Sequence, residues 1–142
     1  IQSLEKLNVK INYIQDGDVT GVISVADNNS NTDIYLGVGG GPEGVLAAAA
    51  VDCLGGQMQT RLVLSDDAEV KRAKKLGITD FKRKYNIADM VKGDVMFCAT
   101  GVTDGDMLKG INIRDNNTFE ATTFALHKSQ KTSKIIKNIV KQ

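Results

Sequence analysis

Histidine and cysteine are scarce in this sequence, which has one histidine, His127, and two isolated cysteines, Cys53 and Cys98. A single histidine argues against a histidine-based metal site and against a Ser-His catalytic pair. The two cysteines lie among apolar residues and do not form a closely spaced metal-binding pair. We therefore expect two buried, reduced thiols and no disulfide framework.

The sequence also lacks an excess of charge of one sign and a long apolar segment. It has 18 basic and 17 acidic side chains, so no overall field favours nucleic acid or an anionic membrane surface. The longest strongly apolar stretch, residues 45–51, is far shorter than the roughly 20 residues of a membrane span. Its first residues do not resemble a signal peptide. We expect a cytoplasmic protein that binds neither nucleic acid nor a membrane.

The 142 residues suit a single domain, residues 1–142, with a core of its own. Strand-like and helix-like patterns alternate along it, which predicts an α/β domain: a layered sandwich of a mixed, partly parallel sheet flanked by helices. Strands are expected at residues 9–14, 33–38, 58–64, 94–100, 111–113 and 119–126, and helices at residues 20–26, 43–53, 68–75, 87–91 and 132–140.

A glycine-rich turn, residues 39–44, lies between an expected strand and an expected alanine-rich helix. Such turns usually receive phosphates, because free backbone N–H groups and the positive helix end attract anions. Glu43 stands at the mouth of this helix, and its carboxylate would repel a bare phosphate. It would suit a metal ion, or a sugar whose phosphate is bound elsewhere.

One interpretation of this turn is a dinucleotide site in an NAD(P)-binding domain of an oxidoreductase. Residues 39–44 satisfy the G-x-G-x-x-G pattern, and Asp66 follows at about the distance of a ribose-binding acid. Pro42 and Glu43 argue against it, because proline removes a backbone donor and the carboxylate adds an anion where pyrophosphate would bind.

A second interpretation joins Glu43 to an acidic turn, Asp16-Gly17-Asp18, which also follows an expected strand and precedes a helix. Both turns would lie at the carboxyl edge of a parallel sheet, where ligands bind. Carboxylates accept hydrogen bonds from sugar hydroxyls and bind Mg²⁺ or Mn²⁺. The alternative is that the two aspartates only cap a helix and that Glu43 only favours a helix start.

Longer motifs resemble one family, the class II fructose-1,6-bisphosphatases of the GlpX type. The resemblance begins at Asp16-Gly17-Asp18-Val19 and covers most of the chain in the same order. Its other motifs are residues 36–50, 53–59, 61–62, 91–97 and 99–106. Within the last of these, Asp104 and Asp106 have no assigned role, and a capped turn is the simpler interpretation.

The resemblance implies a metal-dependent phosphatase that removes the 1-phosphate of fructose 1,6-bisphosphate in gluconeogenesis; some members also accept sedoheptulose 1,7-bisphosphate. It also implies a fold like the C-terminal half of the lithium-sensitive sugar and inositol phosphatases. By this resemblance Asp16, Gly17, Asp18 and Gly40 bind substrate, and Glu43 is a ligand to Mn²⁺ or Mg²⁺.

The family places its other metal carboxylates, and the basic residues that hold phosphate, before the acidic turn. Only fifteen residues precede Asp16 here, and Glu5 is the one acid among them. We therefore expect this chain to be the C-terminal half of a longer protein, inactive without its N-terminal half, and the whole protein to be a homo-oligomer. A non-catalytic sugar-phosphate-binding module is the remaining alternative.

Overall fold

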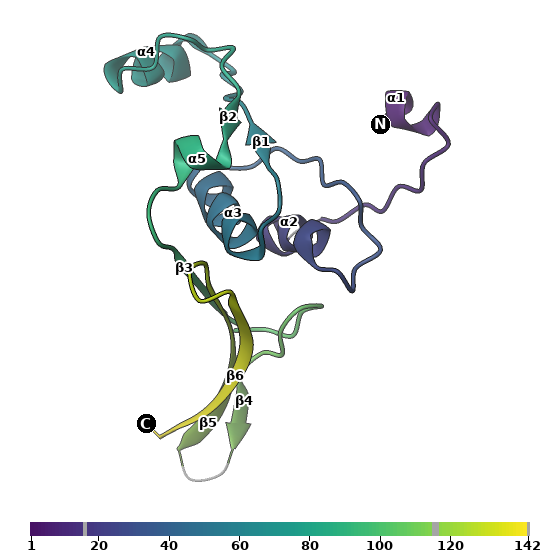
Figure 1. Ribbon diagram of the computed structural model, residues 1–142, viewed down its shortest axis with the longest axis vertical. Coiled ribbons are helices and arrows are strands. Elements are labelled where there is room, and N and C mark those ends of the chain that lie inside the picture. Colours follow the sequence, from purple (N-terminus) through teal and green to yellow (C-terminus); the bar gives the residue numbers. More distant parts are fainter. Residues whose placement is uncertain (16, 115–116, 142) are drawn as a thin grey trace.

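The computed structural model describes residues 1–15, 17–114 and 117–141. Figure 1 shows helices packed together in the middle of the molecule and a long, curved sheet that extends from them toward the C-terminus. The elements, in chain order, are α1 (Gln2–Glu5), α2 (Asp18–Ala26), α3 (Gly41–Leu54), β1 (Gln59–Thr60), α4 (Asp67–Lys75), β2 (Tyr85–Asn86), α5 (Ile87–Met90), β3 (Met96–Thr100), β4 (Asn112–Arg114), β5 (Thr118–His127) and β6 (Thr132–Lys141).

Helix α3 is the central helix, and its ends follow from its sequence. Gly40 is the extended N-cap, Pro42 stands in the first turn, and Gly55 ends the helix in the left-handed conformation with a φ of 74°, which glycine adopts without strain. Its buried residues are mostly alanines, and such small side chains let α2 approach closely. This helix and α2, α4 and α5 confirm the four helices expected within residues 20–91.

The hydrophobic core lies where α2 and α3 meet the sheet. Ile23 of α2, Ala50 of α3, Phe97 of β3 and Leu126 of β5 form one buried cluster. These four residues come from segments far apart in the chain, so the core joins the helices to the sheet.

None of the helices in the described part of the chain has the length and apolar character of a membrane span.

The sheet is built around β5, and it corrects the expected topology. β5 pairs with β3 and β4, and along its whole length with β6, and each of these pairings is antiparallel. The small β1–β2 pair is antiparallel too. The α/β class is confirmed, but the expectation of partly parallel strands is wrong for the described strands. The tight turn of residues 128–131 explains the β5–β6 pairing, because so short a connection can only join antiparallel strands.

The helix expected at residues 132–140 is wrong, because this segment is strand β6. In a helix the isoleucines of this segment would lie on one face, but Ile and Val are also the residues that strands prefer. The tight turn brings the segment alongside all ten residues of β5, where it pairs with the backbone groups of that strand.

Two expected strands, residues 9–14 and 33–38, do not form, and only Gln59–Thr60 forms within the third, residues 58–64. The local patterns are strand-like, but a strand needs a neighbour to accept its backbone hydrogen bonds. Segment 33–38 belongs to none of the strand pairs, and its Ile34, Leu36 and Val38 are 72%, 69% and 81% exposed.

Candidate functional site

The glycine turn before α3 places Glu43 directly over Gly40. A methyl group added to Gly40 would collide with the Glu43 carboxylate, so the side chain folds back across the N-cap residue. Added methyl groups at Gly41 and Gly44 would meet nothing within 4 Å. Glu43 is exposed and stands at the helix end that favours a negative charge. The turn therefore presents one charged carboxylate beside open backbone.

The acidic turn is described only in part. Gly17 is the N-cap of α2 and has a φ of 77°, a left-handed conformation that favours glycine. Asp18 is the first residue of α2, while Asp16 and the side chain of Asp18 lie outside the described residues. What the structure shows of this turn is that its backbone path depends on Gly17.

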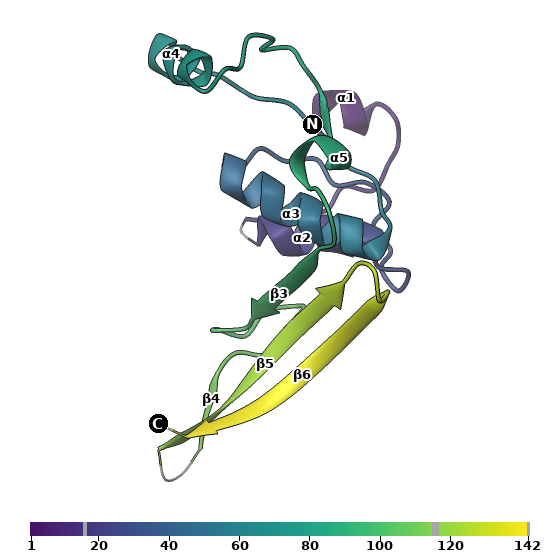
Figure 2. The ribbon, with the colours of Figure 1, turned by 60° about the vertical axis from the view of Figure 1, so that its left-hand side comes forward.

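The two turns lie toward the same end of a pair of packed helices. Helices α2 and α3 are side by side (Figure 2). Their C-terminal ends meet, because a methyl group added to Gly56, just after α3, would be 3.1 Å from the Cβ of Ala26, the last residue of α2. Because both helices run away from their glycines in the same direction, Gly17 and Gly40 lie toward the opposite end. The two turns therefore lie on one side through the parallel course of two helices, and the described strands provide no parallel sheet edge for them.

The described residues do not complete a metal site. No group of three or more His, Cys, Asp or Glu side chains in the described part of the chain could hold a metal ion. Mg²⁺ and Mn²⁺ need several oxygen ligands, of which proteins supply some and water or substrate the rest. The Glu43 carboxylate has the chemistry of one such ligand, and the described residues bring no further pair of His, Cys, Asp or Glu side chains to it.

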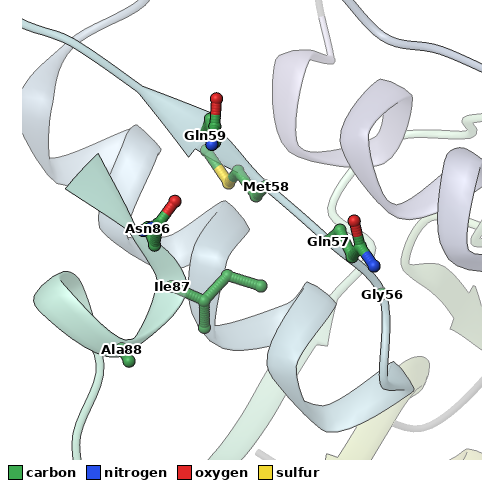
Figure 3. Close-up of a pocket in the computed structure, with 7 residues that line it drawn as sticks. All are labelled: Gly56, Gln57, Met58, Gln59, Asn86, Ile87 and Ala88. Atoms are coloured by element: carbon green, nitrogen blue, oxygen red, sulfur yellow. The ribbon is translucent and has the colours of Figure 1, made fainter. Parts of the chain in front are cut away.

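A hollow beside β1 and β2 is a separate feature (Figure 3). It has a volume of about 380 Å³, and its lining residues are all uncharged: Gly56, Gln57, Met58, Gln59, Asn86, Ile87 and Ala88. It contains none of the residues expected to bind substrate or metal. With no charge to balance a phosphate or a cation, it does not fit a sugar bisphosphate.

Two other acidic residues of interest have structural partners. Asp104 accepts a hydrogen bond from the Gly110 N–H at 3.0 Å, as expected for a capped turn. Asp66 is the N-cap of α4 and accepts from the Glu69 N–H at 2.8 Å. This capping role accounts for Asp66 without a ribose, and it weakens the dinucleotide interpretation.

Sequence analysis missed a polar cluster at the tip of the β5–β6 hairpin. His127 Nε2 lies 2.9 Å from Asp94 Oδ2, and the Ser129 hydroxyl donates to the same oxygen at 2.7 Å. Next to it, Lys128 Nζ forms an ion pair of 2.9 Å with Asp52 at the end of α3. These bonds attach the hairpin to β3 and α3. The serine hydroxyl donates to Asp94 and also lies 3.4 Å from the same His127 Nε2 that contacts Asp94. In a Ser-His-Asp triad the acid and the serine bind different ring nitrogens, so this is not the arrangement of a Ser-His nucleophile.

The expected burial of the thiols is wrong for Cys98, which is exposed on β3, whereas Cys53 on α3 is half-buried. Burial raises the pKa of the Cys53 thiol, which keeps it protonated and unreactive. Both cysteines are free, as expected. No sequence signal pointed to the Asp94–His127 pair, because the two residues are brought together only by the pairing of β3 with β5.

The Asp94–His127 pair is expected to make stability depend on pH. Hydrogen bonds from Ser129 and His127 lower the pKa of Asp94 from 3.8 to about 2, and the hydrogen bond to Asp94 raises the pKa of His127 above 6.5. The aspartate contribution is present above pH 3.8 and is lost as the pH falls toward 2; the histidine contribution is present below pH 6.5 and is lost as the pH rises through its folded pKa. The urea midpoint of the wild-type protein should therefore exceed that of His127→Gln most between these limits. If the urea midpoints of wild type and His127→Gln differ by the same amount at about pH 5.5 and at about pH 8.5, the pair does not cause the pH dependence.

Comparisons with known proteins agree with the motifs. The family model described as "Bacterial fructose-1,6-bisphosphatase, glpX-encoded" matches residues 1–140. The chain is 36% identical over 148 residues to the fructose-1,6-bisphosphatase class 2 of Haemophilus influenzae, covering 95% of this chain and 44% of that protein. It is 34% identical over 124 residues to the D-fructose 1,6-bisphosphatase class 2/sedoheptulose 1,7-bisphosphatase of Synechococcus elongatus, covering 78% of this chain and 36% of that protein. The chain thus spans less than half the length of these two relatives.

Proposed function

The chain belongs to the family of bacterial, glpX-encoded fructose-1,6-bisphosphatases, and we propose that the protein containing it hydrolyses the 1-phosphate of fructose 1,6-bisphosphate to fructose 6-phosphate and phosphate. The observation that carries this proposal is the turn before α3, where the Glu43 carboxylate lies over Gly40. An exposed carboxylate at this position repels a phosphate but attracts a divalent cation. A metal-dependent phosphatase needs such a carboxylate, and a dinucleotide-binding domain does not.

The roles of the site residues are part of the proposal. The carboxylates of Asp16 and Asp18 would accept hydrogen bonds from sugar hydroxyls, and Gly17 gives their turn the left-handed backbone it needs. Gly40 would contact the sugar through its backbone. Glu43 would hold Mn²⁺ or Mg²⁺, which when bound would activate water and neutralise phosphate oxygens.

A further part of the proposal is that this chain works with an N-terminal half of the same protein. The two relatives are more than twice as long as the segments this chain matches, and Glu43 needs more ligands than the described residues offer. The exposed apolar residues of segment 33–38 would then pair in a larger sheet, in a fold like that of the lithium-sensitive phosphatases. We expect the whole protein to be a cytoplasmic homo-oligomer.

The test is phosphate release by the complete protein, as its gene encodes it, with fructose 1,6-bisphosphate and Mn²⁺ or Mg²⁺. We expect hydrolysis that stops when a chelator removes the metal and returns when either ion is restored. Sedoheptulose 1,7-bisphosphate serves as the second substrate. Sugar-phosphate binding without metal and without turnover would instead favour a non-catalytic binding module, and binding of NAD(P) would favour the oxidoreductase interpretation.

Gly40→Ala is expected to reduce phosphate release strongly, by about 10-fold or more, since small misplacements of a catalytic ligand can cost that much. The added methyl group would collide with the Glu43 carboxylate and move it from its position. Gly44→Ala is the matched control, because an added methyl group there meets nothing. The measurement is the steady-state rate of phosphate release by both variants at saturating Mn²⁺. Equal activity of the two variants would remove the geometric reason for assigning this turn.

A further inference from the structure

One aromatic side chain, Tyr35, packs against Gly21 of α2 and Gly37, which precedes the glycine turn. It belongs to segment 33–38, which leads from the end of α2 to the glycine turn. Tyr35 is half-buried, whereas its neighbours Ile34 and Leu36 are 72% and 69% exposed. Tyr35 is therefore the large side chain of this stretch that faces the helices.

The Tyr35 ring packs closely against the backbone of two glycines, Gly21 and Gly37. A methyl group added to Gly21 would be 2.8 Å from Cε2 of Tyr35 and 2.8 Å from Cδ1 of Ile14. One added to Gly37 would be 2.8 Å from Cζ and 2.9 Å from Cε1 of the same ring. Carbon atoms do not approach this closely without a shift, because van der Waals contact between carbons is about 3.5–4.0 Å. The ring thus occupies the space that a side chain at either glycine would fill.

These contacts connect the ring to both turns. The Gly21 N–H donates to the Gly17 carbonyl at 3.0 Å, so the ring packs on the first turn of α2, immediately after the acidic turn. Gly37 precedes Gly40 by three residues, and the ring covers the backbone that enters the glycine turn. Glycine inside a helix is less favourable than alanine, so Gly21 is used here where close packing requires it.

We propose that Tyr35 is a positioning residue that sets the separation of the acidic turn and the glycine turn by packing between Gly21 and Gly37. The proposal rests on the proposed function for its catalytic consequence. A rigid ring between the first turn of α2 and the segment before Gly40 lets the two turns move only together. Since Asp16, Asp18 and Gly40 are proposed to bind one sugar, their separation decides how well all of them contact it.

The test measures the KM for fructose 1,6-bisphosphate of the complete protein, well below its melting temperature. Tyr35→Ala should raise KM by about tenfold or more, because misplaced binding groups lose that much. Gly21→Ala should also raise KM, since its methyl group displaces the ring. The double variant Gly21→Ala/Tyr35→Ala should be little worse than Tyr35→Ala, because the methyl group then meets only the tip of the exposed Ile14 side chain.

Tyr85→Ala is the matched control, since it removes another half-buried tyrosine, one on β2 that packs on Arg83. Its KM should stay at the wild-type value even if its melting temperature falls. A wild-type KM for Tyr35→Ala, or fully additive effects in the double variant, would overturn the proposal.

Hydrogen exchange separates this proposal from the proposed function, because it needs no substrate. The amides of residues 17–22 and 37–44 should exchange faster in Tyr35→Ala than in wild type, and should be unchanged in Tyr85→Ala. If the wild-type protein does not hydrolyse fructose 1,6-bisphosphate, the proposed function fails while faster exchange still supports the packing role. Unchanged exchange in Tyr35→Ala overturns the positioning role whatever the activity.

Discussion

Glu43→Gln in the complete protein is expected to reduce phosphate release from fructose 1,6-bisphosphate by about 100-fold or more, because the metal would lose a charged ligand needed to activate water. Glutamine keeps the size and the polarity of the side chain, so it should keep the fold of the turn over Gly40. What it removes is the negative charge that holds a divalent cation. The measurement is phosphate release at several Mn²⁺ concentrations, and the variant should also need much more Mn²⁺ for half-maximal activity.

Glu69→Gln is the matched control for this prediction. Glu43 and Glu69 each stand at the third position of a helix, α3 and α4 respectively. Glu69 accepts a hydrogen bond from the Ser65 N–H, which a glutamine oxygen can also accept. Its variant should release phosphate at the wild-type rate. Full activity of Glu43→Gln at low Mn²⁺ would show that Glu43 is not a metal ligand.

The second large effect is expected when the 142-residue chain is assayed alone. We expect it to release less than about 1% of the phosphate that the complete protein releases, because a divalent cation needs several oxygen ligands and the described residues contain no cluster of three or more metal-binding side chains. The remaining metal ligands, and the cationic groups that neutralise phosphate oxygens, would lie in the N-terminal half. The measurement is phosphate release with Mn²⁺ by the 142-residue chain and by the complete protein, each at the same molar concentration.

The control for this prediction is recovery of activity. Adding the N-terminal half as a separate fragment, or expressing both halves together, should restore phosphate release, and Glu43→Gln in this chain should prevent the recovery. Vigorous, Glu43-dependent release by the 142-residue chain alone, with no second fragment detected by mass spectrometry, would refute the proposal of a missing half.

Local structure was predicted well where its cause is local. The helices expected at residues 43–53, 68–75 and 87–91 all form, and their ends depend on residues close in sequence, such as Gly55, Asp66 and Asn86. Hydrogen bonds and φ preferences of this range act in the same way in any tertiary context. The glycine turn and the helix start at Glu43 belong to this group, so the candidate site could be proposed from the residues alone.

Strand pairing was predicted poorly because it depends on partners that are distant in sequence. Residues 132–140 fit a helix by pattern and became β6 because β5 offers ten residues for pairing. Segment 33–38 fits a strand by pattern, but no strand is assigned to it in the structure. Burial does not explain β6, whose residues after Thr132 are exposed. Backbone pairing does, because the edge of β5 needs hydrogen-bond partners and a segment joined to it by a tight turn supplies them.

The amino-acid sequence by itself determined the family, the α/β class and the residues of the two turns, because these reside in motifs and local propensities. Only the tertiary structure decided that the strands pair in antiparallel fashion, that Glu43 folds over Gly40, and that Asp94 meets His127. It also placed Tyr35 against Gly21. Each of these contacts depends on how separate segments pack, and packing is set by the shape and pairing of the whole chain rather than by any one stretch of it.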